Sequence, residues 1–174
     1  VSRGLGDVYK RQLGLRGYVS INVQSGECLD THSFATVIGV GATTVNPYLA
    51  FDSLYERFKK KLFSNLSFEE CITRYIKSVN LGLLKIMSKM GISVLSSYRG
   101  GCNFETVGLS RTVVNEYFPG MMSKISGIGL TGIEKKIRSI HKDAFKTNVN
   151  ILPIGGIYRY RKNGEKHQYQ GKLI

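Results

Sequence analysis

A long amphipathic stretch over residues 67–90 constrains the fold of this chain more than any other feature. It opens with Ser67-Phe-Glu-Glu70, a capping box whose side chains can satisfy the free backbone N–H groups at a helix start. Apolar residues then recur in steps of three and four, at Phe68, Ile72, Tyr75, Val79, Leu83, Ile86 and Met90. This spacing predicts one buried face on a helix of about 24 residues, roughly 36 Å long, that ends near Gly91.

Further helices are predicted from residues that can cap a helix start and are followed by apolar residues at helical spacing. The expected starts are Asp30 or Thr31, Asn46 with Pro47 as the first helical residue, Ser110, and the capping box at Thr131. Glycines 39 and 41 are expected to end the first of these helices. The last one carries an apolar stripe that we expect to be buried, at Ile133, Ile137, Ile140 and Ala144.

Strands are predicted between these helices. Residues 18–24 alternate apolar and polar side chains, which is typical of a half-buried strand. Residues 92–95, Ile-Ser-Val-Leu, suit a short buried parallel strand. Asn163-Gly164 predicts the turn of a β-hairpin. Strands that alternate with helices indicate an α/β fold, here an incomplete βα-repeat domain with a C-terminal β-hairpin. Two or three strands are too few for a closed barrel, so we expect this to be part of a larger unit.

Three segments are expected along the chain. Residues 1–12, VSRGLGDVYKRQ, follow no helical or strand period and resemble translated sequencing-adapter sequence, so we predict that they are not native. Residues 13–150 form the α/β part. Residues 151–174 form a connector with the predicted hairpin.

The charge and the cysteines bound the possible partners. A net charge of +13 is compatible with solvated helix faces or with a basic surface that binds nucleic acid or anionic lipid. No motif of a known nucleic-acid-binding module accompanies the charge, so we regard that second function as the alternative and nucleic acid as an unlikely partner. No apolar run is long enough for a membrane span, so none is expected. The cysteines, Cys28, Cys71 and Cys102, are odd in number and far apart, which predicts reduced thiols in the cytoplasm.

The best candidate contact site from the residues alone is the turn at Gly100-Gly101. It follows a predicted strand and precedes a helix, which is where backbone N–H groups bind anions. Arg99 adds a positive charge and Lys89 is a second candidate. The competing interpretation is an ordinary tight turn. Cys102 and His32 offer a nucleophile–base pair, but no third residue orients it. No C-x-x-C pair occurs, so no metal site is predicted.

Several segments resemble the large subunit of glutamate synthases. Residues 75–100, YIKSVNLGLLKIMSKMGISVLSSYRG, are similar to a signature stretch of that family. Further similar segments occur in the family's order: HSFA at 32–35, GATTVNPYLA at 41–50, YFPG at 117–120, SGIG at 126–129 and GGIY at 155–158. The family usually has Ala-Gln-Ile where this chain has Gly101-Cys-Asn103, and often Thr at the position of Pro119.

The resemblance implies that residues 13–150 are part of the central domain of a larger enzyme and that 151–174 lead toward its FMN-binding barrel. Such an enzyme is an oxidoreductase that forms glutamate from glutamine and 2-oxoglutarate, with FMN and a 3Fe–4S cluster. The implied partners are the amidotransferase and FMN-barrel domains of the same polypeptide, and a small reductase subunit or ferredoxin. No catalytic, cofactor or metal residue carries over to this stretch. Lys89, Arg99, Gly100 and Gly101 remain as a predicted inter-domain or anion contact.

Overall fold

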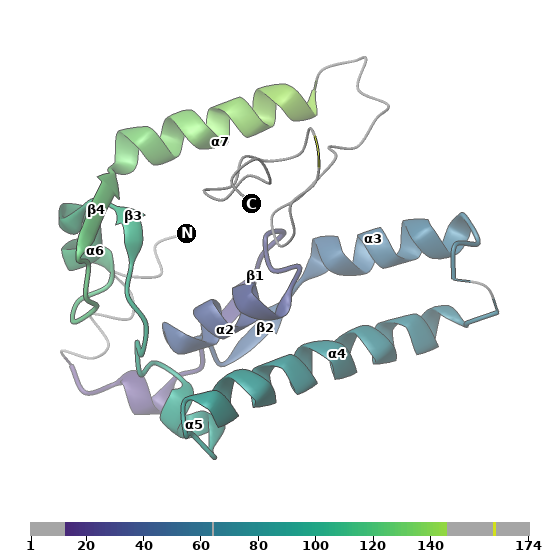
Figure 1. Ribbon diagram of the computed structural model, residues 1–174, viewed down its shortest axis with the longest axis horizontal. Coiled ribbons are helices and arrows are strands. Elements are labelled where there is room, and N and C mark those ends of the chain that lie inside the picture. The colour runs from purple at the N-terminus through teal and green to yellow at the C-terminus, as the bar shows by residue number, and fades with distance from the viewer. Residues whose placement is uncertain (1–12, 64, 146–161, 163–174) are drawn as a thin grey trace. The chain divides into compact units, whose positions relative to one another are not determined.

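The structure is a computed structural model that describes residues 13–63, 65–145 and 162. The chain divides into two compact units, residues 1–130 and 131–174. The first unit begins with the 3-10 turn η1 (Arg16–Tyr18) and then contains two βαβ motifs separated by three helices (Figure 1). The described part of the second unit is helix α7 (Leu130–Ala144), which starts at the boundary residue, together with its neighbour Phe145 and Lys162.

The two βαβ motifs each hold a short parallel two-stranded sheet. In the first, helix α2 (Thr31–Gly39) connects β1 (Asn22–Gln24) to β2 (Thr44–Asn46), with Val23 opposite Val45. In the second, helix α6 (Arg111–Tyr117) connects β3 (Val107–Leu109) to β4 (Ile125–Ile128), and the register shifts between Val107 and Leu109. Parallel strands joined through helices confirm the predicted α/β class and the βα repeat.

Helix α2 begins at Thr31, directly after the predicted capping residue Asp30. The Asp30 carboxylate accepts hydrogen bonds from the N–H and the hydroxyl of Ser33, at 2.8 Å and 2.7 Å. The helix then contributes to both core clusters of this unit. Phe34 packs with Cys28 and Val79, and Ala35 packs with Met87 and Tyr98.

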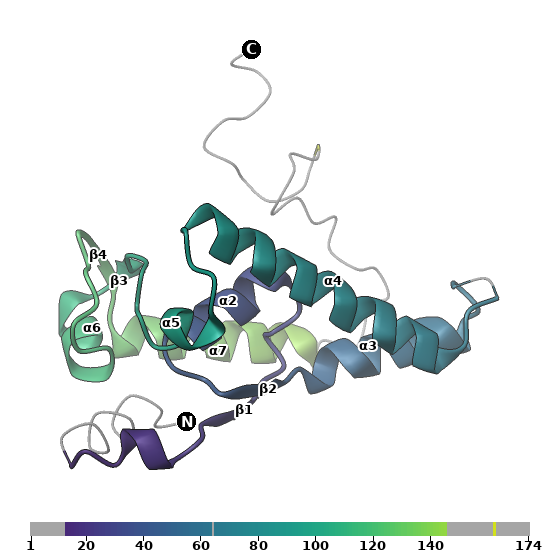
Figure 2. The same cartoon turned by 90° about the horizontal axis from the view of Figure 1, so that it is seen from below.

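Helices α3 (Tyr48–Lys59) and α4 (Phe68–Lys89) pack against each other beside α2, as Figures 1 and 2 show. The Ser67 hydroxyl accepts a hydrogen bond from the Glu70 N–H at 3.2 Å, which confirms the predicted start of α4. Glu70 also pairs with Arg74 at 2.7 Å, one helical turn away. Gly91 adopts a φ of +71°, a left-handed conformation that favours glycine just after a helix end. The ring of Phe68 lies 5.3 Å from that of Tyr55 and joins the two helices.

The strand predicted at residues 92–95 is wrong. Residues 92–94 follow α4 without strand pairing, and Leu95 begins the four-residue helix α5 (Leu95–Tyr98). Ile92 packs against the Ala35–Met87–Tyr98 cluster, whereas Val94 is 56% exposed and therefore not a buried strand residue. A four-residue apolar run does not distinguish a strand from the entry to a helix, and none of the strands in the described residues pairs with it. The predicted strand over 18–24 is shorter, because only Asn22–Gln24 pair, but Val23 is buried as expected.

Two helix starts also differ from prediction. Asn46 belongs to β2, and α3 begins at Tyr48 with Pro47 as the residue before it. Helix α7 already includes Leu130, so Thr131 lies inside the helix. The stripe predicted to be buried on α7 is exposed, with Ile137 and Ile140 at 60% and 57%. The predicted foreign segment 1–12 and the hairpin at Asn163-Gly164 lie outside the described residues and stay predictions.

Candidate functional site

The turn predicted as an anion site lies between helix α5 and strand β3. It follows α5 instead of a strand, and an irregular segment follows it before β3. The N–H groups of Gly100 and Cys102 donate to the carbonyls of Ile38 and Gly39, each at 3.1 Å. The N–H of Gly101 donates to the Tyr98 carbonyl, also at 3.1 Å. Because all three donors are used, the turn satisfies the end of α2 and has no free backbone N–H group to hold an anion.

The backbone conformation and the close packing of this turn explain why glycine occupies positions 100 and 101. Gly100 has a φ of +73°, where a side chain would be strained. A Cβ on Gly101 would approach the carbonyl oxygens of Ser97 and Tyr98 at 3.3 Å. Neither Lys89 nor Arg99 forms an ion pair or side-chain hydrogen bond with another described residue. The predicted anion site therefore has no backbone N–H group free to bind an anion. The side chains of Lys89 and Arg99 remain available for a contact outside this stretch.

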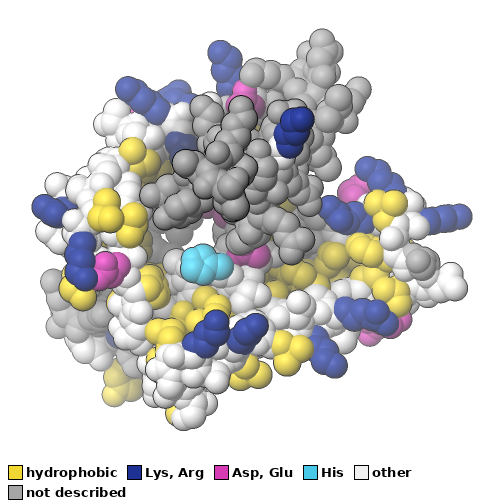
Figure 3. All heavy atoms as spheres, in the orientation of Figure 1, with side chains coloured by type: hydrophobic (Ala, Val, Ile, Leu, Met, Phe, Trp, Pro, Cys, Tyr) yellow, Lys and Arg dark blue, Asp and Glu magenta, His cyan; other side chains and the backbone are white. Residues whose placement is uncertain are grey.

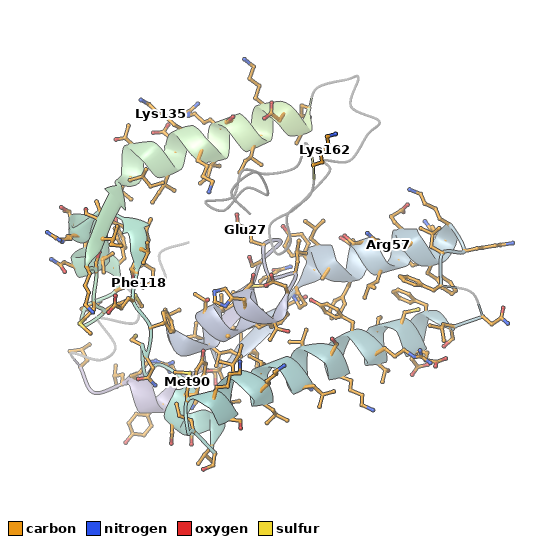
Figure 4. All side chains as sticks on the ribbon, viewed as in Figure 1. Glu27, Arg57, Met90, Phe118, Lys135 and Lys162 are labelled. Atoms are coloured by element: carbon orange, nitrogen blue, oxygen red, sulfur yellow. The ribbon has the colours of Figure 1, made fainter. Side chains whose placement is uncertain are left out.

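A cavity of about 430 Å³ lies between the two βαβ motifs of the first unit. Met90, at the end of α4, and Phe118, at the end of α6, both line this cavity (Figure 4). Its polar lining residues are His32, Thr36, Tyr98, Asn103, Glu105 and Thr106. The residues that line the cavity, polar and apolar together, come from four separated segments, so no local sequence pattern predicts the cavity. Sequence reasoning missed it for that reason.

Two polar groups at this cavity are engaged in the structure. The buried Tyr98 hydroxyl donates a hydrogen bond to the Ala35 carbonyl at 2.9 Å, and burial raises the pKa of this phenol. Glu105 accepts from the Lys124 ammonium at 2.6 Å, and that hydrogen bond and charge raise the pKa of Lys124. These contacts hold residues of the two motifs in place and provide no acid–base pair.

A second groove, of about 320 Å³, runs beside α4. None of its lining residues is charged; they include Phe34, Val45, Pro47, Phe51, Ile76 and Leu95. At its edge the Tyr75 hydroxyl donates to the Leu29 carbonyl at 3.1 Å, and burial raises the pKa of Tyr75. An uncharged groove in a chain with a net charge of +13 suits an apolar occupant and not a nucleic acid.

The Cys102–His32 pair is not formed. Cys102 is anchored at Gly39 near the end of α2, whereas His32 lies in the first turn of the same helix, roughly 10 Å away along its axis. Cys28 and Cys71 are buried, and all three thiols are free. Among the described residues, no group of three His, Cys, Asp or Glu side chains could hold a metal ion. In the same part of the chain, no helix has the length and apolar character needed to cross a membrane.

Comparison with known proteins identifies the family. Residues 8–110 match the model of the glutamate synthase central domain. The chain is 55% identical over 160 residues to the glutamate synthase [NADPH] large chain of Azospirillum brasilense. It is 41% identical to that of Bacillus subtilis and 40% identical to the ferredoxin-dependent glutamate synthase of Pyropia yezoensis. These matches cover 88% to 92% of this chain but only 11% of each relative. The chain therefore belongs to the glutamate synthase central domain family.

Proposed function

We propose that this chain is a non-catalytic part of a glutamate synthase large chain, an oxidoreductase that forms glutamate from glutamine and 2-oxoglutarate. The observation that carries the proposal is the match to the central-domain model together with 55% identity across 92% of the chain. Nothing found supports the alternative of a free-standing nucleic-acid or anionic-surface module. The large chain would contribute to ammonia assimilation and glutamate biosynthesis.

The role of this stretch in the parent enzyme would be to position its neighbouring domains. The described residues support such a role because their polar contacts tie backbone segments together, as the turn at residues 99–102 does for α2 and α5. Lys89 and Arg99 have no ionic partner within the described residues and are proposed as an inter-domain contact, with Gly100 and Gly101 shaping the turn between them and the core.

The cofactors of the proposed parent, FMN and a 3Fe–4S cluster, do not fit the described residues. A cluster requires several cysteine thiolates that converge on one site. Here Cys28 and Cys71 are buried in the protein core, and no three potential ligands converge within the described part of the chain. The amide groups at residues 100–102 are already bonded, so this turn has no free donors for a flavin phosphate. We assign both cofactors to other parts of the parent polypeptide.

The partners proposed for this stretch are the amidotransferase and FMN-barrel domains of the same polypeptide. A small reductase subunit or ferredoxin would deliver electrons to the whole enzyme. Relatives named for NADPH and for ferredoxin match this stretch at 55% and 40% identity. We infer that the choice of electron donor is determined outside it. Three free thiols are consistent with a reducing compartment, and we propose the cytoplasm.

Expression of the chain alone tests the assignment. The purified chain should be colourless, and it should release no ammonia from glutamine. The full-length polypeptide that contains it, supplied with its small reductase subunit and a nicotinamide donor or with reduced ferredoxin, should form glutamate from glutamine and 2-oxoglutarate. A yellow chain with bound FMN would contradict the non-catalytic assignment. Salt-sensitive micromolar binding of residues 13–174 in a gel shift would instead favour the nucleic-acid alternative.

A further inference from the structure

Helix α4 carries an unusual solvent-facing side. Its core-facing residues include Val79 and Met87, which are buried. On the opposite side, Lys77, Leu81, Lys85 and Lys89 follow one another at i,i+4 spacing, and Leu84 lies beside Leu81. We call Lys77, Leu81, Leu84, Lys85 and Lys89 the outer face of α4. Leu81 and Leu84 are 57% and 59% exposed at its centre, and the three lysines around them are exposed.

The charge on this face is uncompensated within the described chain. No aspartate or glutamate occurs between residues 71 and 104. None of the three lysines of the outer face pairs with an acidic group among the described residues. Figure 3 shows basic side chains interspersed with hydrophobic ones along this side of the molecule. The face therefore combines apolar area with a positive potential.

Other helices of the chain show the arrangement expected for a solvated surface. Lys59 pairs with Glu56 on α3, and Arg138 pairs with Glu134 on α7. Arg74 pairs with Glu70 in the first half of α4. These pairs at i,i+3 and i,i+4 spacing are typical of solvent-exposed helices. The second half of α4 has no such pair, and its centre is apolar. Exposed leucines with charged residues around them have the arrangement of an interface, an apolar core with a polar rim.

We propose that the outer face of α4 is a docking surface for an acidic, partly apolar face of another part of the same polypeptide. The leucines would be buried in the contact, and the lysines would meet carboxylates around them. The inference rests on the proposed function in one respect, because it requires a longer polypeptide. The chain spans 11% of the length of its relatives, and its 25 basic residues outnumber its 12 acidic ones, so we assign the complementary acidic groups to another part of the longer polypeptide.

Carbodiimide cross-linking of the full-length polypeptide tests this surface directly, because the reagent joins a lysine amine to a carboxylate only where the two touch. We expect peptides that contain Lys77, Lys85 or Lys89 to be joined to an aspartate or glutamate outside this stretch. The Lys124–Glu105 pair, at 2.6 Å, is an internal positive control. A mixture of ¹⁵N-labelled and unlabelled protein distinguishes links within one polypeptide from links between two.

A charge reversal provides the second measurement. In Lys77→Glu/Lys85→Glu, amide hydrogen exchange of the cross-linked partner segment should increase at least about tenfold, since the charges now repel. The control Lys135→Glu/Lys136→Glu changes the charge by the same amount on the exposed side of α7 and should leave that exchange unchanged. Figure 4 shows Lys135 projecting away from the helix.

The outcomes separate this inference from the proposed function. If the control pair is linked but no outer-face lysine reaches beyond this stretch, the docking surface is rejected. Links found only between two polypeptides reject it as well. A full-length polypeptide that shows the expected links but forms no glutamate rejects the proposed function and leaves the docking surface supported.

Discussion

The contact between β3 and β4 allows a sharp test of the second βαβ motif. A Cβ added to Gly127 would collide with the backbone carbonyl of Gly108 on the neighbouring strand. Because the obstructing atoms are backbone, they cannot move aside by rotation of a side chain. The Gly127→Ala variant must therefore separate two strands that pair in parallel.

The magnitude follows from two opposing effects. Forced overpacking in a closely packed site costs about 1–3 kcal/mol. Replacement of glycine by alanine restricts the unfolded chain and returns about 0.4–1 kcal/mol. We therefore expect a net loss of about 0.5–2 kcal/mol, which corresponds to a melting temperature lower by very roughly 1–8 °C for a chain of this size.

Gly17→Ala is the matched control. Gly17 lies in η1, nothing lies within 4 Å of the position of its Cβ, and its φ is not positive. This variant should melt at or slightly above the wild-type temperature, because only the unfolded-state effect remains. Circular dichroism melts give the two values, and hydrogen exchange locates the loss at residues 106–128. If Gly127→Ala melts as high as Gly17→Ala, the strand contact does not have the geometry described here.

Three further perturbations have expected outcomes. Gly108 has a φ of +86°, so Gly108→Ala should cost about 1–2 kcal/mol through backbone strain although its surroundings are open, as a melt would show. Tyr98→Phe should cost about 0.5–1.5 kcal/mol in urea unfolding, and Tyr75→Phe less, because only the Tyr98 hydroxyl is bonded in a buried position. Desolvation raises the pKa of Asp30, but hydrogen bonds from Ser33 outweigh it and the pKa is lowered overall. The ionised Asp30 carboxylate therefore contributes to the free energy of unfolding above its unfolded pKa of about 3.9, and this contribution is lost as the pH falls through the lower folded pKa. In urea unfolding measured across acid pH, Asp30→Asn should lack this pH dependence.

Local signals in the sequence identified the helices well. The sequence predicts helix caps at Ser67, at Ser110 and at Asp30 or Thr31. Ser67, Ser110 and Asp30 each accept a hydrogen bond from the N–H three residues later, which decides between Asp30 and Thr31. The reason is that a cap is satisfied within one turn, so the residues that decide it are neighbours in the sequence. The pair Glu70–Arg74 was predictable for the same reason.

Elements that depend on distant partners were not predictable in this way. Strands β3 and β4 contain Gly108 and Gly127, and glycine is disfavoured in strands by local propensity. They form because they pair with each other across α6, which a sequence window does not reveal. Residues 92–95 are the opposite case, since their β-branched composition suggests a strand but no strand of the described chain pairs with them. A turn does occur at Gly100-Gly101, but it follows α5 and precedes β3, whereas the sequence predicts a preceding strand and a following helix. The N–H groups of Gly100 and Cys102 bond the end of α2, and only the three-dimensional structure shows this.

Helix α2 connects these observations. It contributes Phe34 to one core cluster and Ala35 to the other, and the carbonyls at its end receive the N–H groups of Gly100 and Cys102. A change that loosens α2, such as loss of its Asp30 cap, should therefore weaken both core clusters and the turn at residues 99–102 together. A change in β3 or β4 has no such connection and should remain local to the second βαβ motif. Hydrogen exchange on Asp30→Ala and Gly127→Ala side by side would reveal this difference: broad loss of protection across α2, α4 and α5 in the first, and loss confined to residues 106–128 in the second. If α4 and the turn at residues 99–102 bind another part of the parent polypeptide, the cap at Asp30 also stabilises that contact, although Asp30 itself does not take part in it.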